Sequence, residues 1–324
     1  MNKYAKRTAL AVLAVSAGFA AHRSYNKELC TGFLPENDMK IELGGDVHAY
    51  TIQEAMFNRV LDRVEQVYGP IVASKGGRLV VNRRWSDGTV NASANQSGGN
   101  WYLNMYGGLA RHAATTEEGF MLVACHELGH HIGGYPKMSW ATNEGGADYF
   151  ATLKCMRNMY GGAAPQGNVD AVAEQACQSQ FADEPTRNSC RNGARGGQSV
   201  AFLFQALRNS PKPPEFGTPD QSRTDRMNNA HPDTQCRLDT YFQGALCTAS
   251  LGTDVSNSDP NAGSCTKKNG QQIGLRSRCW YKPPADEPAL DSAPMAMKRL
   301  ELKTPEAVGS RIEALRDVLL GRGV

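Results

Sequence analysis

The stretch VACHELGHHIGG, residues 123–134, constrains this chain more than any other feature. His126 and His130 are four residues apart, which is slightly more than one helical turn, so both imidazoles leave the same face of a helix. Glu127 lies about 100° further round, where it can reach a metal-bound water without joining the histidines as a ligand. The stretch therefore predicts a helix that carries two metal ligands and a general base.

A pair of carboxylates follows in ATNEGGADYFA, residues 141–151. A catalytic zinc ion keeps three protein ligands and one open position, so a third ligand is needed, and Glu144 is the candidate. Asp148 would face the same way one turn later, and it could accept the free ring N–H of His126 or His130. We therefore predict one catalytic zinc ion bound by His126, His130 and Glu144.

A lone HExxH pattern occurs in many unrelated helices, and the correctly phased carboxylates downstream are what favour a metal site here. His131 is not expected to be a ligand. It points about 100° away from His130, which favours packing or surface exposure.

The first residues have the pattern of a secretory signal peptide, with a basic start and an apolar run from Ala9 to Ala20. We expect residues 1–20 to be removed, and an uncleaved anchor is the alternative. Removal takes away three basic residues and no acidic ones, so the formal charge falls from +3 to zero. This charge gives no support for nucleic acid binding, and the sequence predicts no membrane contact beyond the signal peptide.

Nine cysteines in an exported chain predict a disulfide framework with one cysteine left over. We expect Cys125 to be the odd one, a buried thiol next to His126 on an apolar stretch of helix. A redox-sensitive thiolate near the zinc ion is the alternative. The other eight are expected to pair, mostly within the second half of the chain.

The remaining patterns predict an α+β fold. Residues 51–75 have helical periodicity, with Thr51 and Glu54 as a capping box, and Thr115 with Glu118 would cap the zinc helix. Residues 78–85, 89–94 and 101–106 read as strands of a small antiparallel sheet packed on the zinc helix. Further helices are expected at residues 168–182, 186–208 and 233–245.

The metal-binding domain is expected to span residues 21–281, with the motifs concentrated at about 50–245 and a disulfide-pinned loop at 246–280. Residues 282–324 would form a Pro-rich linker and a C-terminal helix capped by Thr304. The sequence does not indicate an oligomeric state.

A resemblance to a known family rests on four ordered motifs. They are VNASANQSGGNWYLNMYGGLARH at residues 90–112, HELGHH, the ExxAD segment, and His231-Pro232 with Arg237. Together they resemble the gluzincin zinc metallopeptidases of the HtpX and CAAX-prenyl-protease type. The resemblance implies a zincin-like metallopeptidase domain, with His126, His130 and Glu144 as zinc ligands, Glu127 as the base and Asp148 as an outer partner.

The resemblance also implies a substrate strand and a downstream donor. The strand at Asn91 and Ala92 would bind an extended peptide by β-strand addition. His231 would donate to the oxyanion of the attacked carbonyl. Alternatively, His231 or Arg237 hydrogen-bonds one of the carboxylates of the ExxAD segment, or His231-Pro232 caps the helix that follows.

Three departures from the family pattern limit what can be carried over. The connection from His130 to Glu144 is short, Ser93 replaces a large apolar residue, and the membrane helices of some relatives are absent. A membrane-bound substrate is therefore not expected.

The predicted activity is hydrolysis of peptide bonds in a peptide or protein substrate, in which zinc activates a water and Glu127 moves its proton to the leaving amine. The alternatives are a non-catalytic zinc-stabilised binding or chaperone-like module of the cell envelope, and a hydrolase of cell-wall peptides.

Overall fold

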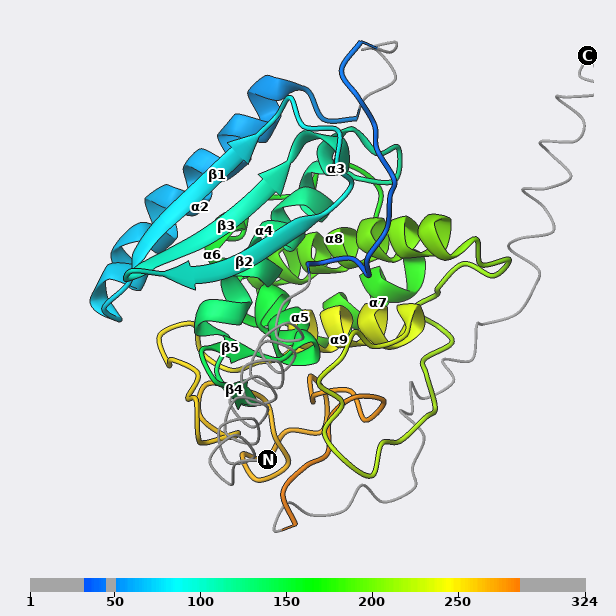
Figure 1. Ribbon diagram of the computed structural model, residues 1–324. Coiled ribbons are helices and arrows are strands. Elements are labelled where there is room, and N and C mark those ends of the chain that lie inside the picture. The colour runs from blue at the N-terminus through cyan, green and yellow to red at the C-terminus, as the bar shows by residue number, and fades with distance from the viewer. Residues whose placement is uncertain (1–31, 45–50, 286–324) are drawn as a thin grey trace, which may run out of the picture. The chain divides into compact units, whose positions relative to one another are not determined.

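The computed structural model describes residues 32–44 and 51–285 (Figure 1). The predicted signal peptide, Cys30 and the predicted C-terminal helix lie outside these residues. No helix in the described ranges is long and apolar enough to cross a membrane.

The strands of the described chain all lie in its first half, and the second half is helical before it becomes irregular. In order they are α2 Glu54–Ser74, β1 Arg78–Arg84, β2 Ala92–Ser97, β3 Asn100–Tyr106, α3 Gly107–Arg111, α4 Glu117–Ile132, β4 Lys137–Met138, β5 Ala141–Thr142, α5 Glu144–Phe150, a π-helical turn Ala151–Cys155, α6 Met156–Tyr160, α7 Ala171–Gln180, α8 Glu184–Arg208 and α9 Thr234–Leu246. The fold class is α+β, as predicted.

The sheet is mixed, and the prediction of an antiparallel sheet was wrong. Its strand order is β1-β3-β2, with β1 parallel to β3 and β2 antiparallel to β3. Gly98 and Gly99 both have positive φ (56° and 79°), as a tight two-residue turn requires, so β2 and β3 form a hairpin. The chain between β1 and β2 instead crosses to the far side of β3. Strand spacing along a sequence does not reveal such a crossing.

Helix α4 is the central element of the fold. It contacts α2, β2 and β3 on one side and α8 and α5 on the other, and every residue from Glu118 to Ile132 is buried. Its N-cap is Thr116, whose hydroxyl accepts from the Gly119 N–H at 3.1 Å. The predicted capping boxes were both wrong: Glu118 pairs with Arg195, and the Thr51 hydroxyl donates to the Thr115 carbonyl at 2.5 Å.

The helical run from α5 through the π-helical turn to α6 returns alongside α4. This places Cys155 opposite Cys125, with their Cα atoms 5.5 Å apart, and the two form a disulfide. The prediction of Cys125 as the odd thiol was therefore wrong. It rested on the apolar neighbours of Cys125, which fit a buried disulfide equally well.

The other three disulfides lie in the second half, as predicted. Cys177–Cys190 joins α7 to α8, while Cys236–Cys279 and Cys247–Cys265 hold the irregular segment after α9 against that helix. All eight cysteines of the described ranges are paired. Disulfide bonds of this density are typical of proteins that fold in oxidising compartments.

Candidate metal centre

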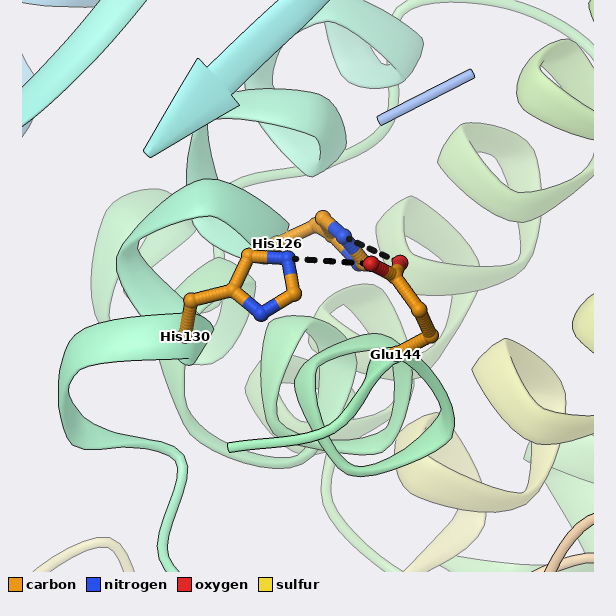
Figure 2. Close-up of side chains that lie close together, drawn as sticks. All are labelled: His126, His130 and Glu144. Carbon is orange, nitrogen blue, oxygen red and sulfur yellow. Dashed lines mark ion pairs between the residues drawn. The ribbon is translucent and has the colours of Figure 1, made fainter. Parts of the chain in front are cut away.

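Helices α4 and α5 bring His126, His130 and Glu144 together, as the spacing predicted. Figure 2 shows both imidazoles pointing at the Glu144 carboxylate, with His126 Nε2 3.3 Å from Oε2 and His130 Nε2 3.7 Å from Oε1. All three side chains are buried. The short connection between the helices contains the hairpin of β4 and β5, which begins after the turn at Gly134 (φ 77°).

When its ring is neutral, each histidine directs an unprotonated Nε2 at this group. His130 Nδ1 lies 2.8 Å from the Thr142 carbonyl, which can only accept, so the proton is on Nδ1 and the lone pair on Nε2. His126 Nδ1 lies 2.7 Å from Asp148 Oδ1, which fixes the same tautomer. The sequence left open whether Asp148 contacts His126 or His130, and in the structure it contacts His126.

The pKa values of the group follow from burial and from the neighbouring charges. Burial lowers the pKa of His130 to about 4, so this ring is neutral at pH 7. Burial opposes the charged form of His126 as well, but the carboxylates of Asp148 and Glu144 outweigh it and raise its pKa to about 9. Against its burial, the two histidines lower the pKa of Glu144 to about 2. In the metal-free protein His126 therefore holds an extra proton that a metal cation at Nε2 would displace.

The three side chains could hold a metal ion, because one ligand atom of each lies within 4.8 Å of the others. Two atoms that each lie about 2.0–2.1 Å from a tetrahedral zinc ion are about 3.3 Å from each other. The histidine Nε2 atoms lie 3.3 and 3.7 Å from the nearest Glu144 oxygen, Oε2 for His126 and Oε1 for His130. His126 Nε2 and Glu144 Oε2 are buried, and although they lie 3.3 Å apart neither atom makes a hydrogen bond of good geometry. A cation between these atoms would satisfy both.

Glu127 lies next to the group without joining it. Its side chain is buried and neither carboxylate oxygen has a hydrogen-bond partner. Burial raises its pKa from 4.5 to about 8 in the metal-free protein. A buried carboxyl without a structural contact is costly to keep, and such groups are common among catalytic acids and bases.

Asp148 is held on three sides. Arg237 Nε and Nη2 donate to its two oxygens at 2.8 and 2.7 Å, and Tyr241 Oη donates to Oδ1 at 2.7 Å. Although Asp148 is buried, Arg237 and His126 hold its pKa well below the usual range, so it stays ionised. Tyr241 was not among the site residues predicted from the sequence. The signal was its position four residues after Arg237, on the same face of α9.

His231 approaches the group from the loop before α9. Its Nε2 lies 3.4 Å from Glu144 Oε2 and 2.8 Å from the Gly32 carbonyl oxygen. It does not cap α9, because the N-cap is Asp233. Burial lowers the pKa of His231, which favours a neutral ring with its proton on Nε2.

Ala92 begins β2, one of the two edge strands of the sheet, and Asn91 immediately precedes it. Their outer edge binds another part of the same chain, because the Ala92 carbonyl accepts from the Phe33 N–H at 2.9 Å. The Asn91 side chain accepts from the Leu34 N–H at 3.0 Å. The predicted substrate strand therefore lies beside the histidine and glutamate group. Its outer edge is hydrogen-bonded to Phe33 and Leu34 of the same chain.

His131 is buried away from the group, as its phase on α4 predicted. Its ring stacks on Trp101 with centroids 5.4 Å apart, and its Nε2 lies 3.1 Å from the Tyr102 carbonyl. A second candidate metal group in the described part, Asp220 with Cys236 and Cys279, is not one, because these two cysteines form a disulfide.

No family model, no curated protein and no solved structure matches the chain. The resemblance to gluzincin peptidases therefore stays a prediction from the motifs.

Proposed function

We propose that this protein is an exported, zinc-dependent metalloendopeptidase. The observation that carries the proposal is Glu127, a buried carboxyl without a hydrogen-bond partner, on the same helix as two histidines whose Nε2 atoms face the Glu144 carboxylate. A site that only stabilised the fold would have no use for this carboxyl, and it would close its fourth coordination position with a protein ligand.

His126, His130 and Glu144 would hold the zinc ion, and Asp148 would keep the His126 ring in place. The zinc ion, when bound, lowers the pKa of a water in its open position and polarises the carbonyl of the substrate. Glu127 takes the proton of that water and passes it to the leaving amine. His231 donates from Nε2 to the carbonyl oxygen as negative charge develops on it.

The edge of β2 favours a peptide as the substrate. Ala92 and Asn91 offer one backbone acceptor and one side-chain amide along the edge, which suits an extended main chain and leaves the side-chain sequence open. The four disulfides support export, and the predicted signal peptide would supply the route.

The test compares Glu127→Gln with the wild type for zinc content and for cleavage of casein. We expect one zinc ion per chain in both proteins and at least ~100-fold slower cleavage in the variant, because loss of a general base costs about 10²–10⁴ in rate. Glu117→Gln makes the same chemical change ten residues earlier on α4 and should leave both values unchanged. Equal cleavage by the Glu127 variant would end the proposal. Incubation with peptidoglycan alongside casein separates a protein substrate from a cell-wall peptide.

A further inference from the structure

Gly32, Phe33 and Leu34 lie inside the site rather than beside it. All three residues are buried, and Phe33 and Leu34 have no exposed surface. The segment that they begin runs antiparallel to residues 88–92 and is drawn in dark blue near β2 in Figure 1. The chain thus covers its own candidate metal centre with an extended peptide.

The backbone of this segment is bound as an added strand. The Phe33 N–H donates to the Ala92 carbonyl at 2.9 Å. One residue later, the Leu34 N–H donates to Asn91 Oδ1 at 3.0 Å, and Asn91 Nδ2 donates to the Leu34 carbonyl at 3.4 Å. These are the main-chain contacts that β-strand addition gives to a peptide ligand.

The two carbonyls that precede Leu34 are bound by side chains of the site. The Gly32 oxygen lies 2.8 Å from His231 Nε2, the nitrogen that lies 3.4 Å from the candidate ligand Glu144. The Phe33 oxygen accepts from Arg237 Nη1 at 2.9 Å. Since His231 is the donor to the carbonyl under attack in the proposed reaction, the Gly32 carbonyl occupies the place of that carbonyl.

The side chains of the segment define two subsites. The Phe33 ring packs edge-on against His126 with centroids 4.9 Å apart, lies 5.3 Å from the Phe204 ring, and faces the Arg237 guanidinium at 4.6 Å. This pocket suits an aromatic side chain, with a cation–π contact as well as apolar burial. At Gly32 a Cβ atom would lie 2.9 Å from Asn91 Nδ2, and φ is +130°, so this conformation admits glycine alone.

We propose that the segment is bound as a substrate, that the bond between Gly32 and Phe33 is cleaved by the protein itself, and that the Phe33 pocket selects substrates with an aromatic residue after the cleaved bond. This inference rests on the proposed peptidase function. In the reaction one water is consumed and the bond from the Gly32 carbonyl carbon to the Phe33 nitrogen breaks. The water oxygen ends in the Gly32 carboxylate, and its proton passes through Glu127 to the Phe33 amine. Cleavage also removes Cys30, the one cysteine outside the four disulfides.

The first experiment determines the N-terminus of the full-length, zinc-loaded protein by mass spectrometry over time. Chains that begin at Phe33 should accumulate in the wild type and be absent from Glu127→Gln. Phe33→Ala should slow cleavage at least ~10-fold, since burial of an aromatic side chain stabilises by about 1.5–3 kcal/mol. Phe33→Leu keeps an apolar side chain in the pocket, so its cleavage rate should lie between the rates of the wild type and Phe33→Ala. Met39→Ala, in the same segment but away from the site, is the control and should be cut at the wild-type rate.

The second experiment measures binding without turnover. A labelled heptapeptide of the sequence TGFLPEN, residues 31–37, is titrated into zinc-loaded Glu127→Gln with and without Phe33→Ala, and followed by fluorescence anisotropy. The Phe33→Ala change weakens the internal competitor, so the peptide should bind at least ~10-fold more tightly to the double variant. Equal affinities would show that the segment is a fixed part of the core, and the inference would be wrong.

The two proposals fail in different ways. If casein is cleaved with the expected dependence on Glu127, but the N-terminus at Phe33 never forms and casein is not cut before aromatic residues, only the further inference is wrong. If neither casein nor the chain itself is cut, the proposed function is wrong as well.

Discussion

The candidate site has two walls that are built in different ways. The ligand wall comprises His126, His130, Glu144 and Asp148, all from α4 and α5, which lie close together in the sequence. The substrate wall comprises Asn91, Ala92 and His231, and it closes through a contact between residues 199 positions apart, His231 and Gly32. Helix phase alone orients the first wall, whereas the second depends on how distant loops pack. Changes in the ligand wall should therefore alter metal binding and stability, and changes in the substrate wall should alter peptide binding.

The largest effect on stability is expected at Arg237, which contacts Asp148 of the ligand wall and Phe33 of the bound segment. It neutralises the buried Asp148 and stacks between the rings of Phe33 and Phe204, at 4.6 and 4.3 Å. Replacement by Met leaves a buried carboxylate without its cation, so the free energy of unfolding should fall by about 3–5 kcal/mol. Urea unfolding of the zinc-free protein measures this loss.

The matched control is Arg208→Met, which removes the exposed pair with Asp233. It should cost less than about 1 kcal/mol. Equal losses in the two variants would mean that Arg237 does not neutralise a buried Asp148 carboxylate as its contacts indicate.

Glu127→Gln should raise the free energy of unfolding of the zinc-free protein, by a smaller amount than Arg237→Met lowers it. Burial raises the pKa of Glu127 from 4.5 to about 8, so the folded chain keeps a proton that the unfolded chain releases. The free energy of unfolding of the wild type should then fall as the pH rises from about 5 to about 8. Gln has no such proton, and the variant should be more stable by about 2–4 kcal/mol at pH 8 and nearly equal near pH 4.

Urea unfolding at several pH values, with Glu117→Gln as the control, measures the difference. Parallel pH curves for the Glu127 variant and the wild type would mean that the Glu127 carboxyl is solvated in solution and not held in the buried state that the mechanism needs.

The smallest effect is expected in the substrate wall. Asn91→Ala removes two hydrogen bonds to the backbone of the bound segment, so the chain should be cut before Phe33 about 10-fold more slowly, the equivalent of about 1.4 kcal/mol. Zinc affinity should stay unchanged. Asn95→Ala on the same strand removes a side chain that contacts Asn104, and it serves as the control. A large loss of zinc affinity in Asn91→Ala would contradict the separation of the two walls.

The ligand wall could be predicted from the sequence because its geometry is local. A spacing of four residues on α4, and again on α5, fixed which side chains share a face, and the structure brings His126, His130 and Glu144 together. The partner of Asp148 among the histidines depended on how the two helices pack, which spacing does not contain. Two predictions were wrong for the same reason, that packing between distant elements is not contained in the spacing. Cys125 is paired with Cys155, and β1 is parallel to β3 where an antiparallel strand was predicted.

The substrate wall was only partly predictable. The motifs marked Asn91, Ala92, His231 and Arg237, yet nothing in the sequence around Gly32 indicated that it would lie against His231. That contact depends on the tertiary fold, which carries residues 32–41 along residues 88–92, the stretch that leads into β2. Tyr241 could not be predicted for a related reason, because it acts only by donating a hydrogen bond to the Asp148 carboxylate.

X-ray absorption at the zinc edge of the metal-loaded Glu127→Gln protein tests the central claim most directly. The account predicts two imidazole nitrogens at about 2.0–2.1 Å, one carboxylate oxygen and one exchangeable water, with no sulfur ligand. His126→Ala should remove one of the nitrogens and most of the bound metal. A fourth protein ligand, or a sulfur near about 2.3 Å, would contradict an open site made by His126, His130 and Glu144.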